Sequence, residues 1–146
     1  MKTATNNLAA AGAFVAVSAG NKDANACQHP PANAAGAMTT AASTSTDTRW
    51  SGSNWGGCVE IYAPGKDLYL PDHPSGYRPG SGTSFASPHV AGVAALYKAT
   101  HGDVGYTVIQ DWMRANAAVG KISDNKSPDP ALNGVTPNLL LTTGGL

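Results

Sequence analysis

Residues 81–92 are the segment of this sequence with the strongest chemical signal. They spell S-G-T-S-F-A-S-P-H-V-A-G and continue into an uncharged apolar run, residues 90–97, which predicts a buried helix. Because proline is tolerated in the first turn of a helix, Pro88 predicts a helix that begins near Thr83 or Ser84. Ser84 would then lie beside unpaired backbone N–H groups and the positive end of the helix dipole, a position that suits a nucleophile whose product is an oxyanion. The alternative is that Thr83 or Ser84 only caps the helix.

A second candidate, Asn21, follows a short apolar run. Residues 13–18 predict a strand that is buried on both faces of a parallel sheet. An Ala-rich helix over residues 6–12 precedes the strand and is expected to end at Gly12. The run ends in S-A-G-N, so Asn21 follows the predicted strand at its carboxyl end. Considered alone, an asparagine after a glycine is most simply a turn residue.

The same N-terminal segment, residues 1–19, also has the features of a short signal peptide. It has a positively charged start, an apolar run and small residues where a cleavage site would lie. We prefer the helix-and-strand interpretation, because removal of this segment would cost the fold a core strand. The run is too short for a transmembrane helix, so no membrane span is expected.

The rest of the chain predicts two further strands and an amphipathic helix. Residues 38–42 and 59–63 are expected to be strands, and Pro64 and Gly65 end the second one. The amphipathic helix is expected over residues 107–118. Surface loops are expected over residues 22–37, 66–80 and 121–133.

Composition and charge exclude two classes of partner. The chain has 146 residues, enough for one domain with a core, and its formal net charge is zero. It therefore has no basic surface for nucleic acid and no polybasic patch for a membrane. The two cysteines, Cys27 and Cys58, are not arranged as a zinc site. They are either free thiols or, in an extracellular protein, a single disulfide.

Residues 82–92 resemble the nucleophile motif of the subtilisin-like serine proteases (subtilases), whose usual form is G-T-S-M-A-[ST]-P-H-V-A-G, and only Phe85 departs from it. Four other segments also resemble subtilase motifs: S-A-G-N at 18–21, D-T-R-W-S-G-S-N-W-G at 47–56, V-E-I-Y-A-P-G at 59–65 and G-V-T-P-N-L-L at 134–140. In the second of these, Gly52 stands where the family has a buried Phe, and Trp50 is the neighbour that could fill the space. The likeness spans about residues 7–141, and it corresponds to the C-terminal half of the family's catalytic domain.

The resemblance implies a fold and a set of site residues. The fold would be α/β, a partial subtilisin-like three-layer fold in which a mostly parallel sheet packs on a buried central helix that starts at the nucleophile. Ser84 would be the nucleophile, and Asn21 with the Ser84 backbone N–H would form the oxyanion hole. In this family, loss of one such donor costs about 100- to 1000-fold in turnover. The residues that would bind a peptide or protein substrate are Ser18, Ala19, Gly20, Gly82 and Thr83.

The resemblance to the proteinase K-like branch has three further implications. It implies a Cys27–Cys58 bridge and secretion. It also implies a structural calcium ion, held by the carboxylate of Glu60 and by backbone carbonyls near Ala35 and Ala37. A solvent-facing strand carboxylate is the alternative for Glu60, and no other cofactor is expected.

The catalytic base is missing from this sequence. The family's D-[TS]-G and H-G-T-H segments, which supply the Asp and His of the triad, are absent, and so is its substrate-pocket segment S-L-G-G. His29, His89 and His101 match no catalytic position, and Asp72 and His73 are neighbours in an expected surface loop. Without the base, activity would fall about a millionfold.

Two hypotheses follow from the sequence. The first is the C-terminal half of a secreted, proteinase K-like serine endopeptidase, either truncated or needing a partner half. The second is a non-catalytic remnant that binds peptide or protein without cutting it. In either case a parallel sheet with an uncovered edge predicts a marginal or self-associating chain, whose partner is the missing N-terminal half or a second copy.

Overall fold

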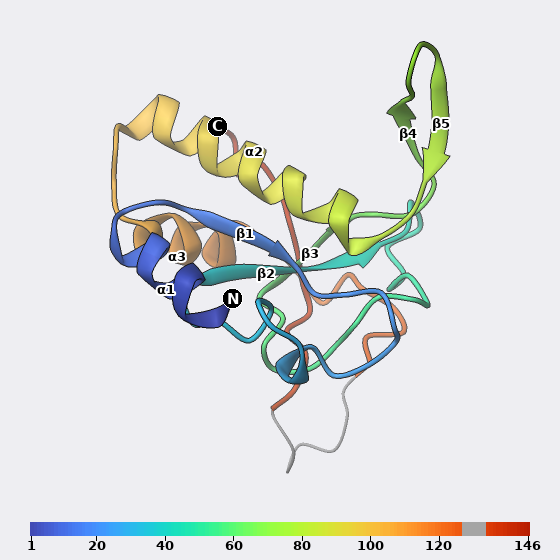
Figure 1. Cartoon of the computed structure of the whole chain (residues 1–146), viewed down its shortest axis with the longest axis horizontal. Helices are drawn as coiled ribbons and strands as arrows, with labels where there is room; N and C mark the ends of the chain where they lie inside the picture. Colours follow the sequence, from blue (N-terminus) through green and yellow to red (C-terminus); the bar gives the residue numbers. More distant parts are fainter. Residues whose placement is uncertain (127–133) are drawn as a thin grey trace.

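In residues 1–126 and 134–146, which the computed structural model describes, the chain forms a five-stranded sheet, three α-helices and a separate two-stranded ribbon (Figure 1). The elements in chain order are α1 (Lys2–Ala10), β1 (Val15–Ser18), the 3₁₀ helix η1 (Ala26–Gln28), β2 (Ala37–Ser43), β3 (Ile61–Pro64), β4 (Leu68–Pro71), β5 (Tyr77–Gly80), α2 (Thr83–His101), α3 (Tyr106–Asn116), β6 (Ala118–Val119) and β7 (Leu139–Leu140).

The sheet has the strand order β1-β2-β3-β7-β6, and all neighbouring pairs are parallel except β6 with β7. Every residue of β2 is buried, as expected for a strand covered on both faces of a parallel sheet. β1 lies at one edge, and no strand in the described part of the chain pairs with its outer side. These features confirm the predicted α/β class.

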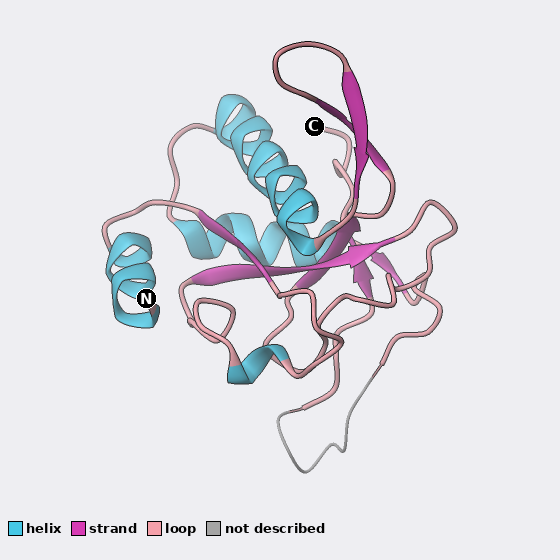
Figure 2. Ribbon diagram, turned by 45° about the vertical axis from the view of Figure 1, so that its right-hand side comes forward, coloured by secondary structure: helices cyan, strands magenta, loops and turns pink. Residues whose placement is uncertain are grey.

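The two faces of the sheet are covered differently (Figure 2). On one face, α2 and α3 pack against Met38, Ile61 and Ala63 in one apolar cluster. On the other face, Ala41 and Tyr62 pack against residues of the connecting loops, among them Ile122. Strand residues alternate between these clusters, as the two-residue period of a strand requires.

The N-terminal segment folds as a helix and a strand. α1 starts at Lys2, and residues 6–10 are its last turns, as predicted. It ends before Gly12, whose φ of +96° is the left-handed conformation that glycine adopts readily after a helix. The side chain of Asn6 accepts a hydrogen bond from Gly36 N at 3.0 Å, which ties α1 to the start of β2.

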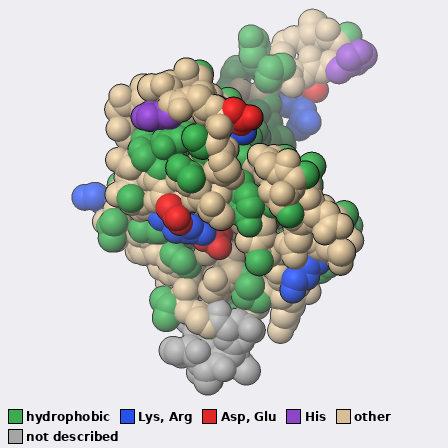
Figure 3. Space-filling model, turned by 90° about the vertical axis from the view of Figure 1, so that its left-hand side faces the viewer, with side chains coloured by type: hydrophobic (Ala, Val, Ile, Leu, Met, Phe, Trp, Pro, Cys, Tyr) green, Lys and Arg blue, Asp and Glu red, His purple; other side chains and the backbone are tan. Residues whose placement is uncertain are grey.

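Residues 66–80 are not a simple loop, so that prediction was wrong. β4 and β5 pair as an antiparallel ribbon that projects from the body of the molecule (Figures 1 and 3). Tyr69 and Tyr77 lie on it as a stacked pair with ring centroids 5.6 Å apart, and Asp72 pairs with Arg78 near its tip. The Pro and Gly residues that suggested a loop occupy the strand ends and the turn.

α2 begins at Thr83, as the sequence predicts, but Pro88 is its sixth residue and lies beyond the first turn. The prediction that the helix is buried on all sides holds for one face only. Val90, Val93 and Tyr97 are buried, whereas Leu96 is 49% exposed. None of the helices in the described residues is long and apolar enough to span a membrane.

Candidate active site

Ser84 lies in the first turn of α2, just after the short connection from β5, and it is at the surface. Gly82 N donates to Gly65 O at 2.7 Å and Phe85 N to Gly82 O at 3.0 Å, so the turn before Ser84 is fixed from both sides. The side chain of Ser84 is exposed. Its backbone N–H belongs to the set at a helix start that has no partner within the helix, so it is available to stabilise a negative charge.

The structure brings Asn21 to the same helix start, although 62 residues separate it from Thr83. Asn21 Oδ1 accepts hydrogen bonds from Thr83 N at 2.9 Å and from Thr83 Oγ1 at 2.7 Å. The amide nitrogen Nδ2 lies near the backbone of Gly82, since a Cβ built on Gly82 would be 3.3 Å from it. The carboxamide oxygen is therefore occupied, while Nδ2, which has no hydrogen-bond partner among the described residues, lies near the start of α2.

The loop after Asn21 is fixed by a buried arginine. Arg49 Nη1 lies 3.1 Å from Asp23 Oδ1 and also donates to Ser53 O at 2.8 Å. Lys126 Nζ donates to the second oxygen of Asp23 at 2.6 Å. The hydrogen bond from Lys126, helped by the charge of Arg49, holds the pKa of Asp23 below its usual value, so Asp23 stays ionised to a lower pH than a free carboxyl group.

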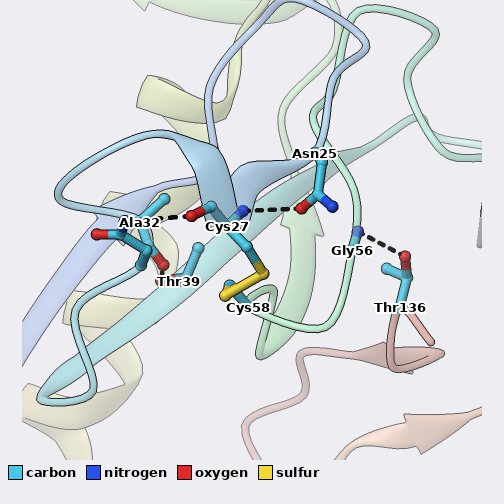
Figure 4. The surroundings of a disulfide bond; sticks show 8 residues. Asn25, Cys27, Ala32, Thr39, Gly56, Cys58 and Thr136 are labelled. Carbon is cyan, nitrogen blue, oxygen red and sulfur yellow. Dashed lines mark hydrogen bonds between the residues drawn. A yellow bond between two sulfur atoms is a disulfide. The ribbon is translucent and has the colours of Figure 1, made fainter. Parts of the chain in front are cut away.

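A disulfide joins Cys27 to Cys58, the pairing that the family resemblance implied (Figure 4). It connects the loop that follows Asn21 to the segment before β3. Asn25 Oδ1 accepts from Cys27 N at 2.9 Å, and Thr136 Oγ1 accepts from Gly56 N at 2.8 Å on the other side of the bridge. Three segments distant in sequence thus converge at the disulfide.

The predicted substrate-binding residues form two adjoining segments. Ser18 ends the edge strand β1, and Gly82 precedes Ser84 in the turn before α2. Ala19 and Thr83 are buried, and Gly20 N donates to Thr83 Oγ1 at 3.1 Å. Because both polar groups of Thr83 that could donate are bound to Asn21, Thr83 supports the site and has no free donor for a substrate.

None of the four histidines pairs with Ser84 in the described structure. His89 lies on α2, about 140° around the helix from Ser84, with Nδ1 2.9 Å from Phe85 O. His101 stacks on Tyr97 at the other end of α2, with ring centroids 4.3 Å apart. His73 follows the end of β4 on the ribbon, and His29 follows η1.

The side chain of Glu60 is partly buried and is paired with an arginine. Its Oε2 accepts from Arg114 Nε at 2.9 Å and Arg114 Nη2 at 2.5 Å, so α3 supplies a positive charge to this carboxylate. Glu60 and Ala35 do line one cavity of about 220 Å³. In the described residues, however, no cluster of three or more acidic, His or Cys side chains could hold a metal ion. The guanidinium of Arg114 beside Oε2 places a positive charge at this carboxylate, which disfavours a cation there, and the calcium site stays a prediction.

Two residues of the site were missed by reasoning from the sequence. Asn54 and Arg49 were matched only as letters of a motif, yet Asn54 binds the backbone on both sides of Asn21 and Arg49 pairs with the carboxylate of Asp23. The D-T-R…S-N pattern marks both residues in the sequence, but it does not indicate which groups they bind. The indole of Trp50 occupies the space that a side chain at Gly52 would take, because a Cβ built on Gly52 would lie 2.7 Å from it. Trp50 therefore fills the space left by the absent Phe.

Comparisons with known proteins agree with this geometry. The model of the subtilase family matches residues 1–136. The chain is 39% identical over 126 residues to alkaline serine exoprotease A of Vibrio alginolyticus, covering 86% of this chain and 24% of that protein. It is 48% identical over 99 residues to the subtilisin-like serine protease Pen ch 13.0101 of Penicillium rubens, covering 68% and 25%. A crystal structure of a cold-adapted subtilisin-like serine proteinase superposes with a TM-score of 0.89 at 36% identity, covering 97% of this chain and 49% of that one. The chain thus spans about a quarter of the curated relatives and half of the solved one.

Proposed function

The chain belongs to the subtilase family, and we propose that residues 1–146 are the C-terminal, nucleophile-bearing half of a subtilisin-like serine endopeptidase domain. The observation that carries this proposal is the pairing of Asn21 with the start of α2, through its two hydrogen bonds to Thr83 beside Ser84. The likeness to the family runs over about residues 7–141, and the disulfide supports a place in the proteinase K-like branch.

In the proposed reaction, Ser84 Oγ attacks the carbonyl carbon of a peptide bond and gives its proton to a base supplied by another segment, forming a tetrahedral intermediate. This intermediate collapses to an acyl-enzyme as the C–N bond breaks and the amine leaves with the proton from the base. The carbonyl oxygen becomes an oxyanion, which accepts hydrogen bonds from the Ser84 backbone N–H and from Asn21 Nδ2. Substrate backbone would lie along Ser18–Gly20 and Gly82, the two segments that border Ser84. Water then hydrolyses the acyl-enzyme.

The proton acceptor must come from another segment, because no histidine of the described chain lies against Ser84. The exposed side of α2 suggests where that segment binds. Ser84 shares one stripe of the helix with small, uncharged and exposed residues, namely Pro88, Ala91, Gly92, Ala95 and Ala99. A segment that packs along this stripe would contact Ser84 at the N-terminal end of the stripe.

The occupant that we propose for this stripe is the N-terminal half of a subtilase catalytic domain, which supplies the Asp and the His. The solved relative is about twice as long as the part that this chain matches, so a complementary half exists in that fold. The unpaired outer edge of β1 lies in the same sheet that α2 covers, and it offers backbone groups for a further strand.

A second candidate function is a peptide- or protein-binding module that does not cut. It is favoured by one observation, that the Ser84 hydroxyl has no base in the described part of the chain. An extracellular location is proposed for either function, because a disulfide is most stable in an oxidising compartment.

The test is reconstitution of the two halves. The purified chain is mixed with the N-terminal segment of a subtilase catalytic domain that carries the D-[TS]-G and H-G-T-H motifs, and hydrolysis of a chromogenic peptide is measured. We expect hydrolysis that needs both components, disappears with Ser84→Ala and survives Ser87→Ala on the same helix. Formation of the complex without hydrolysis would favour the binding module.

A further inference from the structure

We propose that Asn54 is a positioning residue, which clamps the loop 19–24 so that Asn21 presents its amide nitrogen beside Ser84. This inference rests on the proposed function, because it assigns Asn54 a role toward the oxyanion donor. Asn54 is 1% exposed, and in the described structure it makes no hydrogen bond to Ser84 or to the side chain of Asn21.

The evidence is a set of four hydrogen bonds from one residue to both sides of Asn21. On the N-terminal side, Asn54 Nδ2 donates to Ala19 O and Asn54 N donates to Gly20 O, each at 2.9 Å. On the C-terminal side, Asn54 Oδ1 accepts from Lys22 N at 2.9 Å and from Ala24 N at 3.1 Å. The backbone on each side of Asn21 is thus held by two hydrogen bonds to Asn54.

The loop can reach Asn54 only because Gly20 has no side chain. A Cβ built on Gly20 would lie 2.4 Å from Asn54 Nδ2, well inside van der Waals contact. Gly20 also has a φ of +106°, a conformation that other residues rarely adopt. The position of the Asn54 carboxamide therefore requires a glycine at residue 20.

A second anchor acts on the Asn21 side chain itself. Thr83 holds Asn21 Oδ1 with two hydrogen bonds, and Thr83 Oγ1 accepts from Gly20 N at 3.1 Å. Asn54 fixes the backbone of the loop and Thr83 fixes the carboxamide oxygen, which leaves Asn21 Nδ2 as a donor with no partner in the described part of the chain. An oxyanion donor must be held in place before the reaction, because its contribution depends on needing no reorganisation.

The Asn54 side chain both donates and accepts hydrogen bonds, and this needs an amide. Leucine has a similar shape but would leave Ala19 O, Lys22 N and Ala24 N without their partners. Asn138 is a matched control, because its amide clamps both polar backbone groups of Ile122, at 2.9 and 2.8 Å, away from Asn21.

The test compares Asn54→Leu with Asn138→Leu in the isolated, ¹⁵N-labelled chain by NMR. We expect Asn54→Leu to shift or broaden the Asn21 side-chain amide signal and to remove its proximity to Thr83. Asn138→Leu should leave that signal unchanged, even where both variants unfold at lower temperature. A folded Asn54→Leu variant with unchanged Asn21 signals would overturn the proposal.

If Asn54→Leu does not fold, hydrogen exchange of the unaltered chain decides the matter. The Lys22 and Ala24 amides must exchange slowly although their loop lies at the surface, and fast exchange of both would contradict the clamp. In an active complex of the two halves, Asn54→Leu should lower kcat about 10- to 100-fold with KM nearly unchanged, short of the loss expected for removing the donor itself. An inactive complex would count against the proposed function, while the NMR result would still decide the role of Asn54.

Discussion

Thr83 donates two hydrogen bonds to Oδ1 of Asn21, from its backbone N at 2.9 Å and from its hydroxyl at 2.7 Å. These bonds join the loop after an edge strand to the start of the central helix. They orient the Asn21 carboxamide so that its nitrogen, the group able to donate to an oxyanion, faces away from Thr83. A buried threonine thereby couples the folding of α2 to the geometry of the candidate site.

The first prediction concerns this hydroxyl. Thr83→Val keeps the shape of the side chain but removes one bond to Asn21 and the acceptor for Gly20 N. We expect a loss of about 1–3 kcal/mol in unfolding free energy, because the partly buried N–H of Gly20 is left without a partner. Urea denaturation followed by circular dichroism measures it. Thr83→Ser, which keeps the oxygen, should lose less, and equal losses would argue against the hydroxyl as the anchor.

The second prediction is a dependence of stability on pH that arises from Asp23. The hydrogen bond from Lys126 and the charge of Arg49 lower the pKa of this carboxyl group in the folded chain. The unfolded chain therefore binds the proton more readily, so the contribution is present above about pH 4 and is lost as the pH falls through the lower folded value. Asp23→Asn should flatten this part of the stability curve measured between pH 2 and pH 6. If the loss of stability at acid pH is the same in Asp23→Asn as in the unaltered chain, Asp23 does not contribute to that loss.

The third prediction concerns Glu60 and calcium. Because Arg114 already pairs with Glu60, we expect the melting temperature of the chain to be the same in calcium and in a chelator. Arg114→Met should lower the melting temperature, since it leaves a partly buried carboxylate unpaired. A clear rise in melting temperature of the unaltered chain with calcium would restore the metal site that the family resemblance implies.

The fourth prediction concerns the exposed stripe of α2. An uncharged face on a 19-residue helix favours association until its partner covers it. We expect the isolated chain to self-associate in sedimentation experiments, and Ala95→Glu, at the centre of the stripe, to reduce this without changing the far-UV spectrum. Thr100→Glu, at the end of the helix, is the matched control. A monomeric chain with a cooperative melt would show that the stripe needs no cover.

The sequence predicted the elements that local patterns determine. The glycine after α1, the small-residue strand β2 and the start of α2 at Thr83 all follow from nearest neighbours and were confirmed. It did not predict the β4–β5 ribbon, because proline and glycine at strand ends look the same as in a loop.

Long-range partners were beyond the sequence. The pairing of Glu60 with Arg114 joins residues 54 positions apart, and a strand carboxylate gives no sign of which helix will meet it. The four bonds of Asn54 depend on how the loop around Asn21 folds back, which only the tertiary structure fixes. The catalytic roles of Ser84 and Asn21 stay predictions, supported by their proximity at the start of α2.

The most direct test of the central claim is the rate at which a fluorophosphonate labels Ser84. The claim is that this chain has a nucleophile and an oxyanion hole but depends on a separate segment for its base. It predicts very slow labelling of the isolated chain, acceleration by several orders of magnitude on addition of the N-terminal half, and no labelling of Ser84→Ala. Labelling of the isolated chain as fast as that of the complex, or a stable complex in which Ser84 stays unreactive, would contradict it.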